Sequence, residues 1–166
     1  YAPKGQTPML RIPAKREGLS VISTVTNKGE MRWRIYSGAM NAKILTAFLE
    51  RLTRNQQRKI FLILDNLRVH HSKLVKQWLA EHTEQIEIFY LPSYSPELNP
   101  DELLNADLKQ RVTTAAPART KRGLTQSAVR ALRSVQKQPQ RVRSYFRQKD
   151  VSYAASVYTF MRSLGQ

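Results

Sequence analysis

Hydrophobic positions divide the first part of the chain into short elements. Residues 19–26 and 31–37 are rich in β-branched and aromatic side chains, and between them lies Asn27-Lys28-Gly29, which tolerates positive φ. This pattern predicts a β-hairpin. Asn41 can then cap a helix. The apolar face of that helix is formed by residues at helical spacing, which are Ile44, Leu45, Phe48, Leu49 and Leu52.

The middle of the chain alternates apolar runs with helical patterns. Residues 60–64 are continuously apolar and 86–91 form a second short run, which predicts two buried strands. Ser72 can cap a helix between them, and Asn99 can cap another that begins at Pro100. Strands joined by helices pair in parallel with right-handed crossovers. We therefore expect a mixed sheet with the hairpin on one side and helices flanking it.

The two ends of the chain show weaker patterns. Residues 1–19 mix proline, glycine and basic residues and predict an irregular arm, with Met9–Ile12 as a possible edge strand. Residues 113–123 predict a loop. Residues 124–135 have helical spacing, and Pro139 can open a last helix. Three apolar residues of that last helix are expected to pack inward, namely Val142, Tyr145 and Phe146.

Charge adds a functional constraint to this outline. The 166 residues include 28 Lys and Arg against 12 Asp and Glu, a net charge of +16, which favours a polyanionic partner such as DNA or RNA. The absence of cysteine excludes disulfides and thiolate zinc sites. No apolar run approaches the length of a membrane helix. We expect a cytoplasmic, nucleoid-associated protein without membrane contact.

The basic residues concentrate in the C-terminal third. No Asp or Glu occurs from 109 to 149, so this part is expected to contact phosphates. The candidate DNA-binding residues are Lys109, Arg111, Lys121, Arg122, Arg130, Arg133, Lys137, Arg141 and Arg143.

Two carboxylates stand at the ends of predicted elements. Asp65 follows the apolar strand 60–64, where an Asp-Asn pair also fits a turn bonded to its own backbone. Glu102 lies three residues after Asn99, a spacing that also fits a reciprocal capping box. Considered together, they lie where two parallel strands end at one sheet edge, so their oxygens can converge on Mg²⁺ or Mn²⁺. Two such ions can promote phosphodiester transfer.

The sequence around these acids resembles a known family. Ile63-Leu64-Asp65-Asn66 with His70, and then Tyr90-Leu91-Pro92-Ser93-Tyr94-Ser95-Pro96-Glu97-Leu98-Asn99-Pro100-Asp101-Glu102, is similar to the second half of a DDE superfamily endonuclease. The nearest resemblance is to bacterial insertion-sequence transposases related to the mariner group. The 36 residues between the two acids suit that family. Residues 1–115 resemble it well, and 116–166 resemble it more loosely.

The resemblance implies a ribonuclease-H-like catalytic core over 1–115, with a basic helical extension of the same domain over 116–166. It also implies that Asp65 and Glu102 are the second and third metal-binding acids of a transposase that cuts and joins DNA. The acids before Asp65 are Glu17, Glu30 and Glu50, and none ends a central strand. The first acid and its strand are therefore expected to be missing, which makes this chain alone inactive.

A missing central strand is also a folding problem, because unpaired strands invite other partners. Three remedies are open. The arm at Met9–Ile12 can fill the gap, a second chain can supply a strand, or the sheet can close up. We expect a homodimer with exchanged strands.

Several further residues have two interpretations each. His70 and Asn66 can support the metal site, although a helix-start histidine and a turn are equally ordinary roles. Trp33 and Trp78 are expected in the core, and Tyr94 is expected to pack rather than to stack on DNA. The alternative to a transposase catalytic domain is a non-catalytic, DNA-binding remnant of one, which needs no metal.

Overall fold

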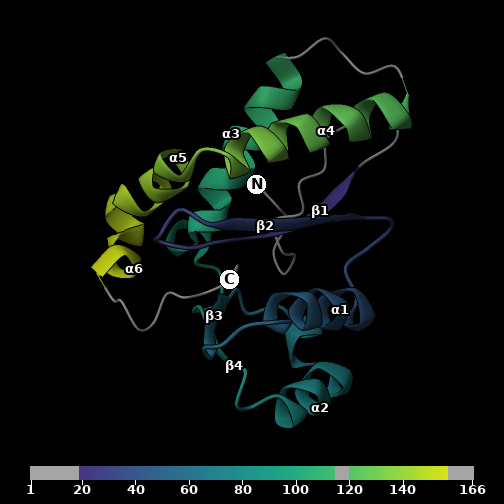
Figure 1. Cartoon of the computed structure of the whole chain (residues 1–166), viewed down its shortest axis with the longest axis vertical. Coiled ribbons are helices and arrows are strands. Elements are labelled where there is room, and N and C mark those ends of the chain that lie inside the picture. Colours follow the sequence, from purple (N-terminus) through teal and green to yellow (C-terminus); the bar gives the residue numbers. More distant parts are fainter. Residues whose placement is uncertain (1–18, 115–119, 157–166) are drawn as a thin grey trace.

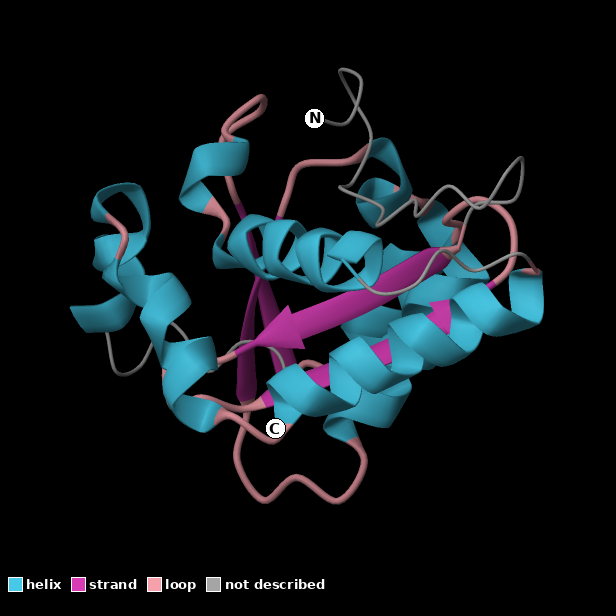
Figure 2. Cartoon of the chain, turned by 90° about the horizontal axis from the view of Figure 1, so that it is seen from above, coloured by secondary structure: helices cyan, strands magenta, loops and turns pink. Residues whose placement is uncertain are grey.

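The computed structural model of the chain describes residues 19–114 and 120–156. Within them the chain is an α/β protein whose two small sheets are flanked by helices, as Figures 1 and 2 show from two directions. This architecture is compatible with the expected ribonuclease-H-like fold. The predicted arm and its edge strand Met9–Ile12 lie outside the described residues.

The hairpin is confirmed. β1 (Ser20–Val25) pairs antiparallel with β2 (Met31–Tyr36). The turn closes through a hydrogen bond from the Thr26 N–H to the Glu30 carbonyl, 2.9 Å long. Gly29 has φ +94°, a conformation that suits glycine because it lacks a Cβ.

The helix–strand alternation is also confirmed. α1 (Ala42–Thr53) leads into β3 (Ile60–Leu64), and α2 (Lys73–Glu81) leads into β4 (Ile86–Tyr90). β3 and β4 are parallel, as predicted. Both predicted caps form. The Asn41 side-chain oxygen accepts from the Ile44 N–H at 3.0 Å, and the Ser72 hydroxyl accepts from the Val75 N–H at 3.4 Å.

The expectation of one mixed sheet is wrong for the described residues. They contain two separate two-stranded sheets, β1–β2 and β3–β4. Within the described residues β1 and β3 are therefore not hydrogen-bonded to each other. A cavity of about 60 Å³ lies between them, bordered by Val21–Thr24 on one side and Ile63–Asp65 on the other.

Two hydrophobic cores hold these sheets. The first joins the hairpin to the C-terminal helices and includes Leu104, Leu132 and Phe146, while the second joins α1 and α2 to β3 and β4. Figure 1 shows the hairpin between α4 above and α1 below. Trp33 packs against the first core and Trp78 against the second, which confirms their expected packing roles.

The C-terminal helices differ from prediction mainly in their bounds. They are α3 (Pro100–Thr114), α4 (Lys121–Gln136), α5 (Pro139–Ser144) and α6 (Ser152–Ser156). The loop predicted over 113–123 is therefore shorter at both ends. Thr120 causes the earlier start of α4, because its hydroxyl accepts from the Gly123 N–H at 3.1 Å.

The inward packing predicted for the last helix is confirmed. Val142, Tyr145 and Phe146 are all buried. Short 3₁₀ turns at Tyr145–Arg147 and Lys149–Val151 follow α5. Among the described residues, no helix combines the length and the apolar character that crossing a membrane requires.

Candidate active site

Asp65 lies at the carboxyl end of β3, immediately after the last paired residue. The register pairs Leu64 with Tyr90, and the N–H of Leu91 donates to the Leu64 carbonyl at 2.7 Å. The two parallel strands therefore end together. The loop that leads to α3 leaves from the same edge as Asp65, as the sequence predicted.

Glu102 lies in the first turn of α3, whose N-terminus is organised by Asn99. The Asn99 side-chain oxygen accepts from the Asp101 N–H at 3.0 Å, which confirms the cap. The main-chain N–H of Asn99 donates instead to the Pro96 carbonyl at 3.0 Å. The alternative of a capping box is thus not realised, because Glu102 does not take up that N–H.

The two acids share one electrostatic environment. Burial and, after it, the negative charge of Glu102 raise the pKa of Asp65 to about 7, against the lowering effect of the main-chain N–H of Asp65. Burial also raises the pKa of Glu102, while the positive charge of Lys109 lowers it. A site where carboxylates repel each other at reduced solvation is stabilised by a bound cation.

A third carboxylate, Asp101, belongs to the same cluster. The Ser23 hydroxyl of β1 lies 2.9 and 3.1 Å from its two carboxylate oxygens. Burial raises the pKa of Asp101 to about 7, the hydrogen bond from Ser23 lowers it, and the charges of Glu102 and Asp65 raise it. In the sequence, Asp101 stands out only as part of the motif that ends at Glu102. Its partner Ser23 is 78 residues away, which no local pattern reveals.

The donor set suits a hard divalent cation. No group of three or more His, Cys, Asp or Glu side chains in the described part of the chain is arranged to hold a metal ion. Mg²⁺, however, is commonly held by one or two carboxylates, with water and substrate phosphate as its remaining ligands. Asp65 and Glu102 fit that arrangement, and Asp101 contributes negative charge beside them.

His70 holds the backbone at Asp65. Its Nδ1 lies 2.7 Å from the Asp65 carbonyl oxygen and 3.3 Å from the carboxylate Oδ1. Burial lowers the pKa of His70, although the bond to the Asp65 backbone raises it. A carbonyl oxygen can only accept, so this hydrogen bond places a proton on Nδ1 of His70. The side chain is 3% exposed, so His70 acts through Asp65 rather than by direct contact with DNA.

Asn66 connects the end of β3 to the proline-rich loop after β4. Its amide nitrogen donates to the Ser93 hydroxyl at 3.2 Å, and its oxygen lies 2.5 Å from Nε2 of His71. The His71 ring packs on Tyr90, with ring centroids 4.3 Å apart. These contacts fix the loop beside Asp65.

Tyr94 departs from its expected packing role. It lies in the proline-rich loop with φ +62° and is 73% exposed. Non-glycine residues in this conformation are uncommon and concentrate at functional sites. The exposed ring is therefore not packed in the core.

The predicted DNA-binding residues fall into two groups. Arg111 and Arg141 are bonded to Asp107, and Nε of Arg143 donates to the Lys28 carbonyl at 2.9 Å. These three arginines therefore stabilise the fold. The others are exposed on α3 and α4, or directly after α4, and they are Lys109, Lys121, Arg122, Arg130, Arg133 and Lys137.

Comparison with known proteins identifies a matching family. A family model described as DDE superfamily endonuclease matches residues 1–125. A search of curated proteins found no match.

Proposed function

The chain belongs to the DDE superfamily endonuclease family, and from this membership we propose that it is a transposase catalytic domain. Its reaction would be metal-dependent cleavage of DNA followed by transfer of a strand to target DNA. One observation carries this proposal: Asp65 at the end of β3 is half-buried and lies within the electrostatic field of Glu102, across 36 intervening residues. The partners are transposon ends and target DNA.

Asp65 and Glu102 are the residues that would hold Mg²⁺ or Mn²⁺. When bound, such ions activate the attacking oxygen and stabilise the leaving oxygen of a phosphodiester. His70 keeps the Asp65 backbone in place through its 2.7 Å hydrogen bond. Lys109, whose charge acts on Glu102, is suited to a phosphate beside the acids. The exposed basic residues of α3 and α4 would hold the DNA.

We further propose that the isolated 166-residue chain has little strand-transfer activity. The resemblance implies that members of this family have one more metal-binding acid, which precedes Asp65 in sequence order. Glu30 lies at the hairpin turn and Glu50 is exposed on α1, so neither stands beside Asp65 at the end of β3. Efficient Mg²⁺-dependent cutting by this chain, lost in Asp65→Asn, would refute this part of the proposal.

A homodimer with exchanged strands remains part of the proposal. The described strands β1 and β3 are not paired with each other, so each leaves a strand edge that a strand from a second copy would pair with. Light scattering tests this directly. A monodisperse monomer at micromolar concentration would count against the dimer.

The metal site is tested by thermal unfolding with and without Mn²⁺. We expect Mn²⁺ to raise the melting temperature of the chain, and we expect Asp65→Asn or Glu102→Gln to abolish that increment. Glu84→Gln makes the same chemical change at an exposed position and should retain it. An increment that persists in both site variants would place the ion elsewhere.

The alternative function is a non-catalytic DNA-binding remnant. It rests on the net charge of +16 and on the exposed basic residues of α3 and α4, which bind phosphate without a metal. This alternative predicts tight, salt-sensitive DNA binding with no Mn²⁺-dependent stabilisation. The same thermal experiment therefore separates the two functions.

A further inference from the structure

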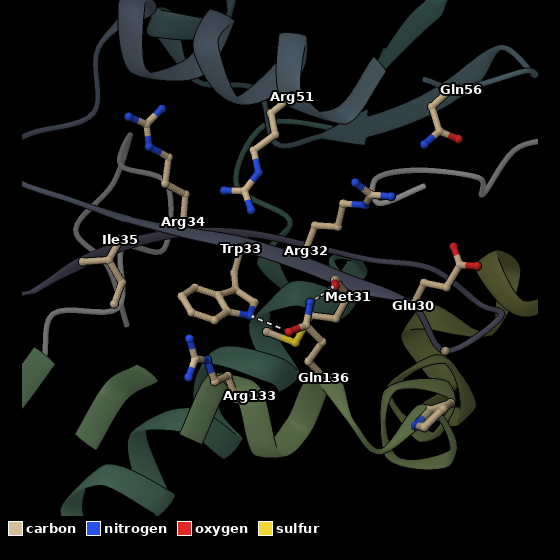
Figure 3. Close-up of a pocket in the computed structure, with 12 residues that line it drawn as sticks. Glu30, Met31, Arg32, Trp33, Arg34, Ile35, Arg51, Gln56, Arg133 and Gln136 are labelled. Carbon is tan, nitrogen blue, oxygen red and sulfur yellow. Dashed lines mark hydrogen bonds between the residues drawn. The ribbon is translucent and has the colours of Figure 1, made fainter. Parts of the chain in front are cut away.

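A broad groove runs along the outer edge of the hairpin, away from the carboxylates. It has a volume of about 1000 Å³ and is lined by residues of β2, α1 and α4 (Figure 3). Four arginines line it, whereas Glu30 is its one acidic residue. The arginines are Arg32, Arg34, Arg51 and Arg133. We call this surface the β2 groove.

The groove is basic on both faces of β2. Successive side chains of a strand point to opposite faces, so Arg32 and Arg34 share one face and Trp33 lies on the other. Arg51, in the last turn of α1, lies on the side of Arg32 and Arg34, while Arg133 of α4 lies on the side of Trp33 (Figure 3). Positive charge is therefore present on both sides of the strand edge.

Trp33 is held in a fixed orientation within the groove. Its Nε1–H donates to the Gln136 side-chain oxygen at 3.3 Å, and the Gln136 amide donates to the Met31 carbonyl at 2.9 Å. The bond from Gln136 occupies the Met31 carbonyl, which a strand added to the edge of β2 would need as a hydrogen-bond acceptor. The groove is thus less suited to an extended peptide than to a partner recognised by charge.

Guanidinium groups point to phosphate as the ligand. Arginine offers a planar fork of donors that matches phosphate oxygens, and several arginines along one groove match a repeating phosphodiester backbone. The half-buried indole of Trp33 adds a flat, rigid wall. The charge of the whole chain, +16, is consistent with a nucleic acid partner.

The hairpin separates this groove from the acids. Ser23 of β1 binds Asp101 and is paired in register with Trp33 of β2. The β2 groove therefore begins one strand beyond the carboxylate cluster, on the opposite edge of the hairpin. A phosphate bound in the β2 groove therefore cannot lie at Asp65 at the same time.

We propose that the β2 groove binds the phosphodiester backbone of a DNA segment other than the one at the carboxylates. This inference rests on the proposed function in that DNA is the partner. Phosphate binding by the β2 groove requires no divalent ion, so this inference and the proposed metal site can be refuted separately. It also assigns a role to Arg32, Arg34 and Arg51, which lie outside the basic C-terminal third.

Trp33 provides a reporter for the occupied groove. The chain has two tryptophans, so Trp78→Phe leaves Trp33 as the only one. The iodide quenching of its fluorescence is measured with EDTA present, with and without a 20-base-pair duplex. We expect the duplex to reduce the quenching constant at least twofold, because bound DNA covers the groove and excludes the anion.

Affinity measurements identify the arginines responsible. We expect Arg32→Gln, Arg34→Gln and Arg51→Gln, combined in one chain, to weaken duplex binding at least tenfold. The slope of log affinity against log salt should fall by about three, roughly one for each lost phosphate contact. The matched control combines three exposed lysines elsewhere, Lys43→Gln, Lys73→Gln and Lys76→Gln, and should change affinity less than twofold.

Three results would overturn the inference. The first is an equal loss of affinity in the two triple variants when circular dichroism shows that both are folded. The second is DNA binding that leaves iodide quenching of Trp33 unchanged. The third is protection of Trp33 by poly-glutamate but not by duplex at equal charge, which would identify an acidic peptide as the partner. Loss of the Mn²⁺ effect alone would leave the groove intact and refute only the metal site.

Discussion

Replacing Asp107 by asparagine should destabilise the chain, because Asp107 connects three of its helical segments. It lies on α3 and accepts from Arg111 of the same helix at 3.0 Å. Arg141 of α5 donates to both of its oxygens, at 2.5 and 2.6 Å, and the Tyr145 hydroxyl donates at 2.5 Å. Burial alone raises the pKa of Asp107, but these hydrogen bonds outweigh burial and hold it at about 2.

The size of the effect follows from that pKa. The ordinary value is 3.8, and the difference from about 2 corresponds to about 2.5 kcal/mol, at 1.36 kcal/mol for each pH unit. Because the folded-state pKa is the lower one, this stability is present above pH 3.8 and is lost as the pH falls through about 2. About half of it is gone by pH 3, where unfolded chains are mostly protonated at this site.

Urea unfolding at pH 7 and pH 3 measures this contribution. We expect Asp107→Asn to lower the free energy of unfolding by about 2 to 3 kcal/mol at pH 7 and by about half as much at pH 3. Asp150→Asn, the same change at an exposed carboxylate, is the control and should have little effect. A loss below about 0.5 kcal/mol at pH 7, or one that does not depend on pH, would refute the reasoning.

Two further predictions concern the hairpin turn and the candidate site. A Cβ on Gly29 would lie 2.5 Å from the Pro139 carbonyl oxygen, so Gly29→Ala should cost more than Gly38→Ala, which has a similar φ but nothing within 4 Å. Equal losses in urea unfolding would contradict this contact. The pKa of Asp65 is raised to about 7 in the folded chain. Between about pH 4 and 7 the folded chain therefore keeps a proton on Asp65 that the unfolded chain has lost, and the folded state loses stability as the pH rises through that window. Asp65→Asn without metal should therefore stabilise the chain at pH 8 by at least about 1 kcal/mol, and a decrease in its melting temperature would contradict the burial argument.

Much of the candidate site followed from local sequence. The apolar run 60–64 and the caps at Asn41, Ser72 and Asn99 act over a few residues, so they predicted where elements begin and end. Those ends place Asp65 and Glu102. The two simpler interpretations, a turn and a capping box, were also local, and only the actual partner of the Asn99 N–H excluded the second.

Other features depended on contacts between distant segments. Whether the hairpin joins the parallel pair is decided by backbone pairing between β1 and β3, and the single sheet expected from element order did not form in the described residues. The basic residues had been assigned to DNA by their sequence density. Asp107 bonds Arg141 within the fold, 34 residues away, while Arg34 and Arg51 gather in a groove that charge density did not indicate.

The sequence by itself therefore determined the elements, their caps, the parallel pairing and the family, because periodicity and short motifs act within a few residues. Only the tertiary structure decided which side chains meet. It brought Ser23 to Asp101, enclosed Asp107 among its donors and placed arginines around β2. The burial and charge of these side chains depend on contacts between segments far apart in the chain, so no local sequence pattern reveals them.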